Sequence, residues 1–177
     1  MTNIQDVLLW DEIGRSELLN LLKTESKKIN IHDIMQASLF LIKDSLYVQE
    51  NYRREMLEAY TSGFIIRIKE VKDHERTENS ALDVDEVKEA VELLANQEKE
   101  ASKREDFNPE FFRIYKIISL YTTFILDEPI HPVGTPFPGG FKVRFNGKRY
   151  LCPVKEKQKD NPSAVCGFCT AEQDPEI

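Results

Sequence analysis

The chain has 177 residues, of which 41% are hydrophobic and 31% are charged. This composition is typical of a soluble globular protein and excludes a disordered one. No apolar run approaches the ~20 residues that cross a bilayer, and the N-terminal sequence lacks the basic flank and cleavage site of a secretory signal. We therefore expect a cytoplasmic protein whose three cysteines stay reduced and form no disulfide framework.

The charge is unevenly distributed along the chain. Residues 1–128 carry 17 basic and 26 acidic groups, a net charge of −9, whereas residues 129–177 carry 7 basic and 5 acidic groups, a net charge of +2. The acidic part is a poor surface for nucleic acid, because a phosphate backbone needs concentrated positive charge. We expect no nucleic-acid or membrane partner, and we leave a homo-oligomer or a protein partner open.

The first part of the chain has the pattern of helices. Asn30 and Asn108 are placed as N-caps, and Pro109 follows at the first helical position. Asp83 and Glu86 predict a capping box for a further helix. A short helix is expected from Ser16. Another helix is expected where apolar residues recur three or four positions apart and so form one face, at Tyr52, Met56, Tyr60, Phe64, Ile68 and Val71. The stretch from Phe111 to Leu126 is apolar on most sides and should be the central, most buried helix.

The composition changes near Pro129. Residues 1–128 hold two glycines and one proline, whereas the remaining residues hold seven prolines and five glycines. Such residues exclude helix and favour turns. The sequence therefore predicts a mainly α fold in two parts: a helical bundle over residues 1–128, and a module over residues 129–177 made of a Pro/Gly-rich loop, a β-hairpin and a three-cysteine metal site.

A hairpin is predicted for "FKVRFNGKRYLC" around Asn146-Gly147, the dipeptide suited to a two-residue type I′ turn. This register pairs Arg144 with Arg149, Val143 with Tyr150 and Phe141 with Cys152, and it directs Phe141, Val143, Tyr150 and Cys152 onto the helices. Lys142, Arg144 and Arg149 then share the outer face. That face either binds an anionic partner or ligand, or forms salt bridges with the acidic helical part.

The cysteines are the strongest chemical signal. Cys166 and Cys169 are separated by two residues, a spacing that lets both sulfurs face one ion, and Cys152 lies on the hairpin 14 residues earlier. Tetrahedral Zn²⁺ needs a fourth ligand, for which His131 in the glycine-rich loop is the nearest suitable residue. Reactive thiols and plain buried cysteines are the alternatives. Two alternatives to ligation by His131 stay open. His131 forms a hydrogen bond with the end of the central helix, or the fourth metal position is open.

The runs "HPVGTPFPGGFKVRF", "YLCPVK", "KDNPSAVC" and "FCTAEQD" resemble the C-terminal signature of a family of uncharacterised archaeal proteins, mainly from methanogens, known as domain of unknown function 2115. The resemblance covers about residues 128–174. It implies an archaeal cytoplasmic protein and supplies no activity or catalytic residue, so whether the chain is an enzyme stays open. It also raises the prospect of iron–sulfur chemistry, because methanogen cytoplasm is anaerobic.

From these features we expect a metal-binding protein with a structural Cys3His zinc site that ties the C-terminal segment to the helices. The alternative is an iron–sulfur protein, either an enzyme or an electron carrier. It would hold a 4Fe-4S cluster with three cysteine ligands and an open or non-cysteine fourth position.

Overall fold

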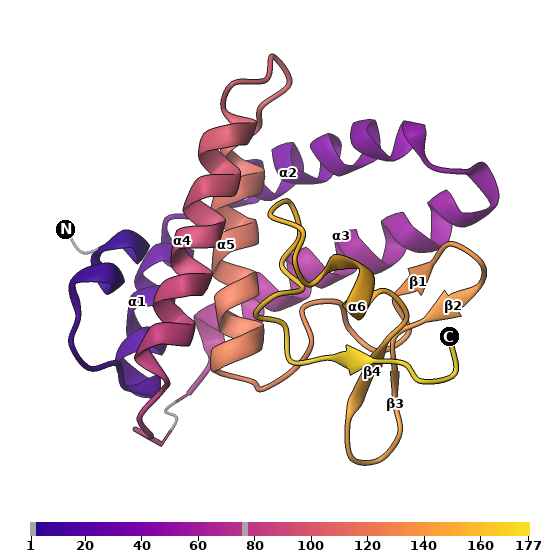
Figure 1. The fold of residues 1–177 in the computed structure, drawn as a ribbon. Helices are drawn as coiled ribbons and strands as arrows, with labels where there is room; N and C mark the ends of the chain where they lie inside the picture. Colours follow the sequence, from indigo (N-terminus) through magenta and orange to yellow (C-terminus); the bar gives the residue numbers. More distant parts are fainter. Residues whose placement is uncertain (1–2, 76–77) are drawn as a thin grey trace.

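The computed structural model describes residues 3–75 and 78–177, except for the side chain of Phe64. Its helical part contains, in chain order, η1 (Ile4–Leu9), α1 (Arg15–Lys27), α2 (Ile31–Asp44), η2 (Ser45–Tyr47), α3 (Glu50–Asp73), α4 (Val84–Ala101) and α5 (Pro109–Phe124). Its C-terminal part contains β1 (Pro136–Phe137), β2 (Phe141–Lys142), β3 (Arg144–Phe145), β4 (Tyr150–Cys152), α6 (Lys155–Gln158) and β5 (Glu172–Gln173). The fold is therefore mainly helical with small sheets near the C-terminus (Figure 1).

The helix starts follow from local side-chain chemistry. The Asn30 side chain accepts hydrogen bonds from the backbone N–H groups at the start of α2, and the Asp33 carboxylate accepts the N–H of Asn30 at 2.9 Å. Asn108 caps α5 by accepting the N–H of Phe111 at 2.7 Å. Both N-caps confirm the sequence prediction, because a cap needs only residues within one turn.

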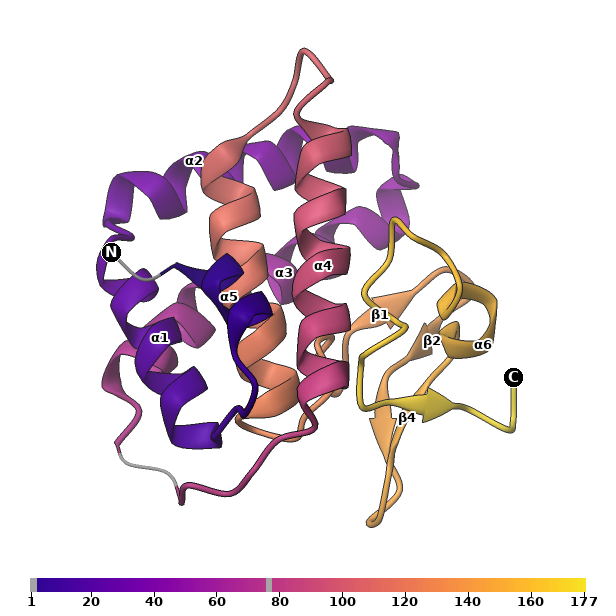
Figure 2. The same ribbon diagram turned by 60° about the vertical axis from the view of Figure 1, so that its left-hand side comes forward.

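Helix α5 is the centre of the helical part. Ile114, Ile117 and Leu120 are fully buried, and α1, α2, α3 and α4 all pack against α5. From α3, Ile68 and Val71 enter the same core, whereas the predicted contribution of the Phe64 side chain lies outside the described residues. Figure 2 shows α5 between α1 and α4. Among the described residues, no helix has the length and apolar character to cross a membrane.

The C-terminal segment lies against this bundle beside α3, α4 and the end of α5 (Figures 1 and 2). Val165 belongs to the hydrophobic core, and the ring of Phe168 stacks on Phe124 at 6.2 Å between centroids. The Tyr52 hydroxyl of α3 donates a hydrogen bond to the carbonyl of Pro136 at 2.6 Å. These contacts fix the segment on the helices through a few side chains rather than through a large core of its own.

The predicted hairpin register is wrong by two residues. The structure pairs Arg144 with Leu151 and Phe145 with Tyr150, and it pairs Phe141 with Phe137 rather than with Cys152. The cause is Asn146, whose side-chain oxygen accepts the N–H groups of Lys148 and Arg149 and so closes a four-residue loop. Arg144 and Arg149 therefore do not face each other across the hairpin.

Candidate functional site

Three free cysteines come from two elements of the C-terminal segment. Cys152 ends β4, and Cys166 and Cys169 lie in the loop that leads into β5. β4 and β5 run parallel, and the N–H of Asp174 donates to the carbonyl of Cys152 at 3.0 Å. Cys152 and Cys166 are buried, whereas Cys169 is half-buried. The parallel pairing therefore returns the chain to the strand that carries Cys152 after the loop that carries the other two.

Lys155 joins the two cysteine segments. It begins α6 three residues after Cys152, and its ammonium donates hydrogen bonds to the carbonyls of Cys166 and, at 2.7 Å, Cys169. Gly167 lies between those carbonyls, where an added Cβ would be 3.2 Å from the backbone oxygen of Lys159. The loop between the two cysteines thus runs close to the end of α6, and glycine permits that approach.

The three thiols share one electrostatic environment. Burial, which is the largest cause, and the neighbouring Cys152 and Cys169 thiols together raise the pKa of the Cys166 thiol to about 11. Burial also raises the pKa of Cys152, whereas hydrogen bonds from the backbone N–H groups of Val154 and Lys155 lower it. Cys152 and Cys166 are therefore protonated at neutral pH, which argues against nucleophilic thiolates in the metal-free chain.

No group of three or more His, Cys, Asp or Glu side chains is arranged to hold a metal ion in residues 3–75 and 78–177. The sulfurs are thus gathered in one region without being placed in a coordination geometry. Cys152 and Cys169 both raise the pKa of Cys166, so the three sulfurs still lie within electrostatic reach of one another. A bound cation would lower the pKa of the thiols that it contacts, because it stabilises the thiolate form.

His131 lies in the loop between α5 and β1 and faces α3. Its Nε2 atom is 2.8 Å from the Tyr60 hydroxyl, and its ring meets the rings of Tyr60 and Phe137 edge-on. Burial lowers the pKa of His131 to about 4, so the ring is neutral at pH 7. A neutral ring is the form that binds metal ions.

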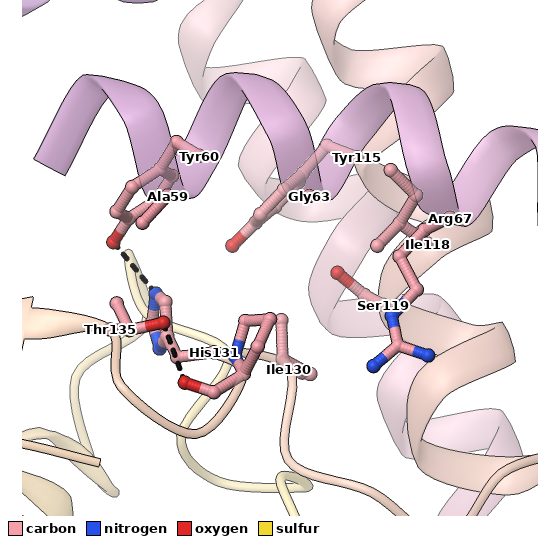
Figure 3. A pocket seen from close by; sticks show the side chains of 11 residues that line it. Ala59, Tyr60, Gly63, Arg67, Tyr115, Ile118, Ser119, Ile130, His131 and Thr135 are labelled. Carbon is pink, nitrogen blue, oxygen red and sulfur yellow. Dashed lines mark hydrogen bonds between the residues drawn. The ribbon is translucent and has the colours of Figure 1, made fainter. Parts of the chain in front are cut away.

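Next to His131, a cavity of about 50 Å³ lies between α3, α5 and the loop of Pro132 (Figure 3). Tyr115 and Ser119, one turn apart on α5, contribute to its wall. The Ser119 hydroxyl is fully buried and has no hydrogen-bond partner among the described residues. Gly63 of α3 also lines the cavity, and an added Cβ there would meet no atom of the described residues within 4 Å. The contact between the helices and the C-terminal segment is therefore incompletely filled beside His131.

Cys169 also lines a larger cleft of about 890 Å³, which is open to the α4 side of the molecule. The ionisable residues of this cleft are mainly acidic: Asp83, Glu86, Glu89, Asp127 and Asp160 against Arg15 and Lys159. Arg15 is itself paired with Asp127 at 2.6 Å. A cleft with one prevailing sign of charge concentrates counter-ions, here cations, next to the most accessible thiol.

The predicted anion-facing residues are each paired with carboxylates. Arg144 donates two hydrogen bonds of 2.6 Å to the buried Asp174 carboxylate. Arg149 pairs with Glu172 at 2.8 Å, and Lys142 pairs with Glu55 of α3 at 3.2 Å. The salt-bridge alternative accounts for this arrangement, but only Lys142 pairs with the helical part. The two arginines pair with the last residues of the chain.

Several residues of the site carry no signal in the sequence. Lys155 was one lysine in a charged run, and Tyr115 and Ser119 were part of an apolar helix. Their spacing of four residues on a buried helix was the one available hint, because it places two hydroxyl groups on one face. Asp174 could not be paired with Arg144 in advance, since 30 residues separate them.

Comparisons with known proteins give the family. The family described as an uncharacterized protein conserved in archaea (DUF2115) matches residues 14–174. A UPF0305 protein of Methanothermobacter thermautotrophicus is 38% identical over 161 residues, which are 91% of this chain and 97% of the relative. A UPF0305 protein of Methanocaldococcus jannaschii is 32% identical over the same shares of the two chains. No solved structure matches significantly. With nearly its whole length matched, the chain belongs to the archaeal DUF2115 family.

Proposed function

We propose that the protein binds a metal ion through Cys152, Cys166 and Cys169, and that the ion is zinc. The observation that carries the proposal is the gathering of the three thiols around Lys155, close enough for each neighbour to raise the pKa of Cys166. Backbone N–H groups directed at the Cys152 sulfur support the same conclusion, because thiolate ligands accept such hydrogen bonds. A movement of the loop from Cys166 to Cys169 toward Cys152 would complete the site.

A structural role for the metal follows from the way the C-terminal segment is held. Few of its residues enter the apolar core, and its strands are two or three residues long. Short strands and a small buried surface stabilise little on their own. A metal ion bound across β4 and the 166–169 loop would supply the missing free energy, as structural zinc does in other small modules.

His131 is our proposed fourth ligand. With Nε2 facing the Tyr60 hydroxyl, Nδ1 is the nitrogen left for the ion, and the Tyr60 contact would fix the ring in the manner of an outer-sphere partner. The loop that carries His131 would have to bring Nδ1 to the sulfurs. Were Nδ1 not to reach the sulfurs, the three cysteines would present an open position, which is the arrangement that favours a 4Fe-4S cluster.

The compartment that fits this proposal is the cytoplasm. All three cysteines are free, and such thiols persist where the surroundings are reducing. The cationic hairpin residues are already neutralised by Asp174, Glu172 and Glu55. We therefore propose no nucleic-acid partner.

Anaerobic purification followed by measurement of zinc, iron, acid-labile sulfide and the visible spectrum tests the proposal. We expect about one zinc per chain, no sulfide and a colourless solution. Single Cys152→Ser, Cys166→Ser and Cys169→Ser variants should each lose the zinc, because two thiolates cannot replace the full chelate. Full zinc content in all three variants would contradict the proposal. Iron with equimolar sulfide and a brown colour would show that the site holds an iron–sulfur cluster and not zinc.

The fourth ligand is tested with cobalt in place of zinc. Co²⁺ reports its donor set through its visible absorption, so a His131→Asn variant should shift the spectrum of the tetrahedral Co²⁺ site. His32→Asn is the matched control, since His32 is an exposed histidine on α2. An unchanged spectrum in His131→Asn would remove His131 from the ligand set while leaving the three cysteines in place.

A further inference from the structure

Helix α2 exposes a continuous row of large apolar side chains. The row runs on into η2, and we call its five members the α2 stripe; they are Ile31 (70% exposed), Met35 (56%), Leu39 (55%), Ile42 (46%) and Leu46 (61%). Their spacing of four, four, three and four residues keeps them on one side of a helix. Tyr47, which is 93% exposed, adjoins the end of the stripe.

The opposite side of α2 is apolar as well. Ala37 is buried in the core, and Ile34 and Leu41 pack against it. A helix that is apolar on both sides is normally covered on both sides. Contiguous exposed apolar patches of this size on a soluble chain mark an interaction surface. Within a single chain, therefore, the apolar side of α2 that carries the stripe is not buried.

We infer that a second copy of this chain covers the α2 stripe, forming a dimer with two-fold symmetry. The stripe and Tyr47 together present roughly 700 Å² per chain, which is near the ~800 Å² per partner of a standard stable interface. The three-and-four spacing is that of a helix that packs along another helix. A two-fold dimer supplies such a helix, because the same patch meets itself.

The helix dipoles select an antiparallel arrangement. Antiparallel pairing sets the negative C-terminal end of α2 in one copy beside the positive N-terminal end of α2 in the other, whereas parallel pairing sets like ends side by side. In both views α3 lies between α2 and the C-terminal strands, so the interface would leave the cysteines free (Figures 1 and 2).

Sedimentation equilibrium of the full chain at 0.15 M salt, with a thiol reductant present, tests the inference. We expect a dimer at micromolar concentration and a Leu39→Glu variant whose dimer dissociation constant is at least 100-fold higher. Leu9→Glu is the matched control: Leu9 is 83% exposed but lies in η1, outside the stripe, so this variant should remain dimeric. Ile42→Glu gives a second position on the stripe, and far-UV circular dichroism should show all three variants folded.

A wild-type chain that stays monomeric throughout the concentration range would overturn the inference. So would a Leu39→Glu variant that dimerises like wild type. The orientation has its own test, in which Ile31→Cys and Leu46→Cys chains are mixed and oxidised. Cross-linking between the two variants supports the antiparallel dimer, whereas cross-linking of Ile31→Cys chains to one another contradicts it.

Discussion

The helical part and the C-terminal segment are held together by different physical means. In the helical part, α5 is surrounded by other helices and its inner side chains are fully buried. In the segment after residue 128, short strands depend on Asn146, on the Arg144–Asp174 pair and on the Lys155 ammonium. The stabilising apolar burial of the helical part is spread over many residues, whereas the hydrogen bonds and ion pairs that hold the C-terminal segment are few and directional. We therefore expect single substitutions in the helical core to destabilise the whole fold, and single substitutions at these polar contacts to loosen only the C-terminal segment.

The largest effect is expected from the centre of α5. Leu120→Ala removes part of a fully buried side chain and leaves a cavity, so it should lower the free energy of unfolding by about 2–5 kcal/mol. Urea unfolding followed by circular dichroism and by tyrosine fluorescence should show both parts failing together. If the C-terminal segment stayed folded while the helices unfolded, the two parts would be independently stable, which would contradict this expectation.

A smaller and local effect is expected from Lys155→Ala. This variant removes the ammonium that donates to the carbonyls of Cys166 and Cys169, and hydrogen bonds to a charged group contribute about 1.5–3 kcal/mol. Amide hydrogen exchange should quicken over residues 152–174 and stay unchanged in α5. Lys157→Ala is the matched control, because Lys157 is exposed on the same short helix. Equal exchange in the two variants would show that the tie at Lys155 is dispensable.

The contact between the two parts should respond to pH through His131. Its pKa in the folded chain is about 4, below the ordinary value near 6.5, so the unfolded chain binds the proton first as pH falls. The contribution of neutral His131 is complete above about pH 6.5 and is lost progressively down to about pH 4. In metal-free protein we expect a loss on the order of 1–3 kcal/mol over that window.

Unfolding free energies measured between pH 5 and 7 limit the interference from carboxyl groups. His131→Asn should flatten the profile, whereas His32→Asn, which changes an exposed histidine, should keep the slope of the wild type. A His131→Asn profile as steep as that of the wild type would assign the slope to other groups.

The sequence predicted the features that depend on neighbouring residues and missed those that depend on distant ones. The caps at Asn30 and Asn108 and the burial of α5 were correct, because one turn of helix or one apolar pattern contains the required information. The hairpin register failed because the Asn146 side chain binds two backbone N–H groups, a choice that the Asn-Gly dipeptide does not reveal. The grouping of the cysteines around Lys155 depends on β4 and β5 pairing across about 20 residues.

The smallest effect concerns Gly63, at the cavity between the two parts. Glycine within a helix costs about 1 kcal/mol relative to alanine, and no atom in the described part of the chain lies within 4 Å of an added Cβ at this position. Gly63→Ala should therefore raise the free energy of unfolding by up to about 1 kcal/mol if the cavity is only a packing defect. Ala59→Gly, one turn earlier on the same cavity wall, is the matched control and should lower the free energy of unfolding by a similar amount.

The sign of the Gly63→Ala change separates two explanations of the cavity. A gain in stability means that the helices and the C-terminal segment meet imperfectly at Tyr115 and Ser119. A loss, with Ala59→Gly behaving as expected, means that the space beside Gly63 is filled in solution, by water or a small molecule bonded to the unpartnered Ser119 hydroxyl. In that case the contact between the two parts depends on a bound molecule as well as on His131, and its stability should vary with what occupies the cavity.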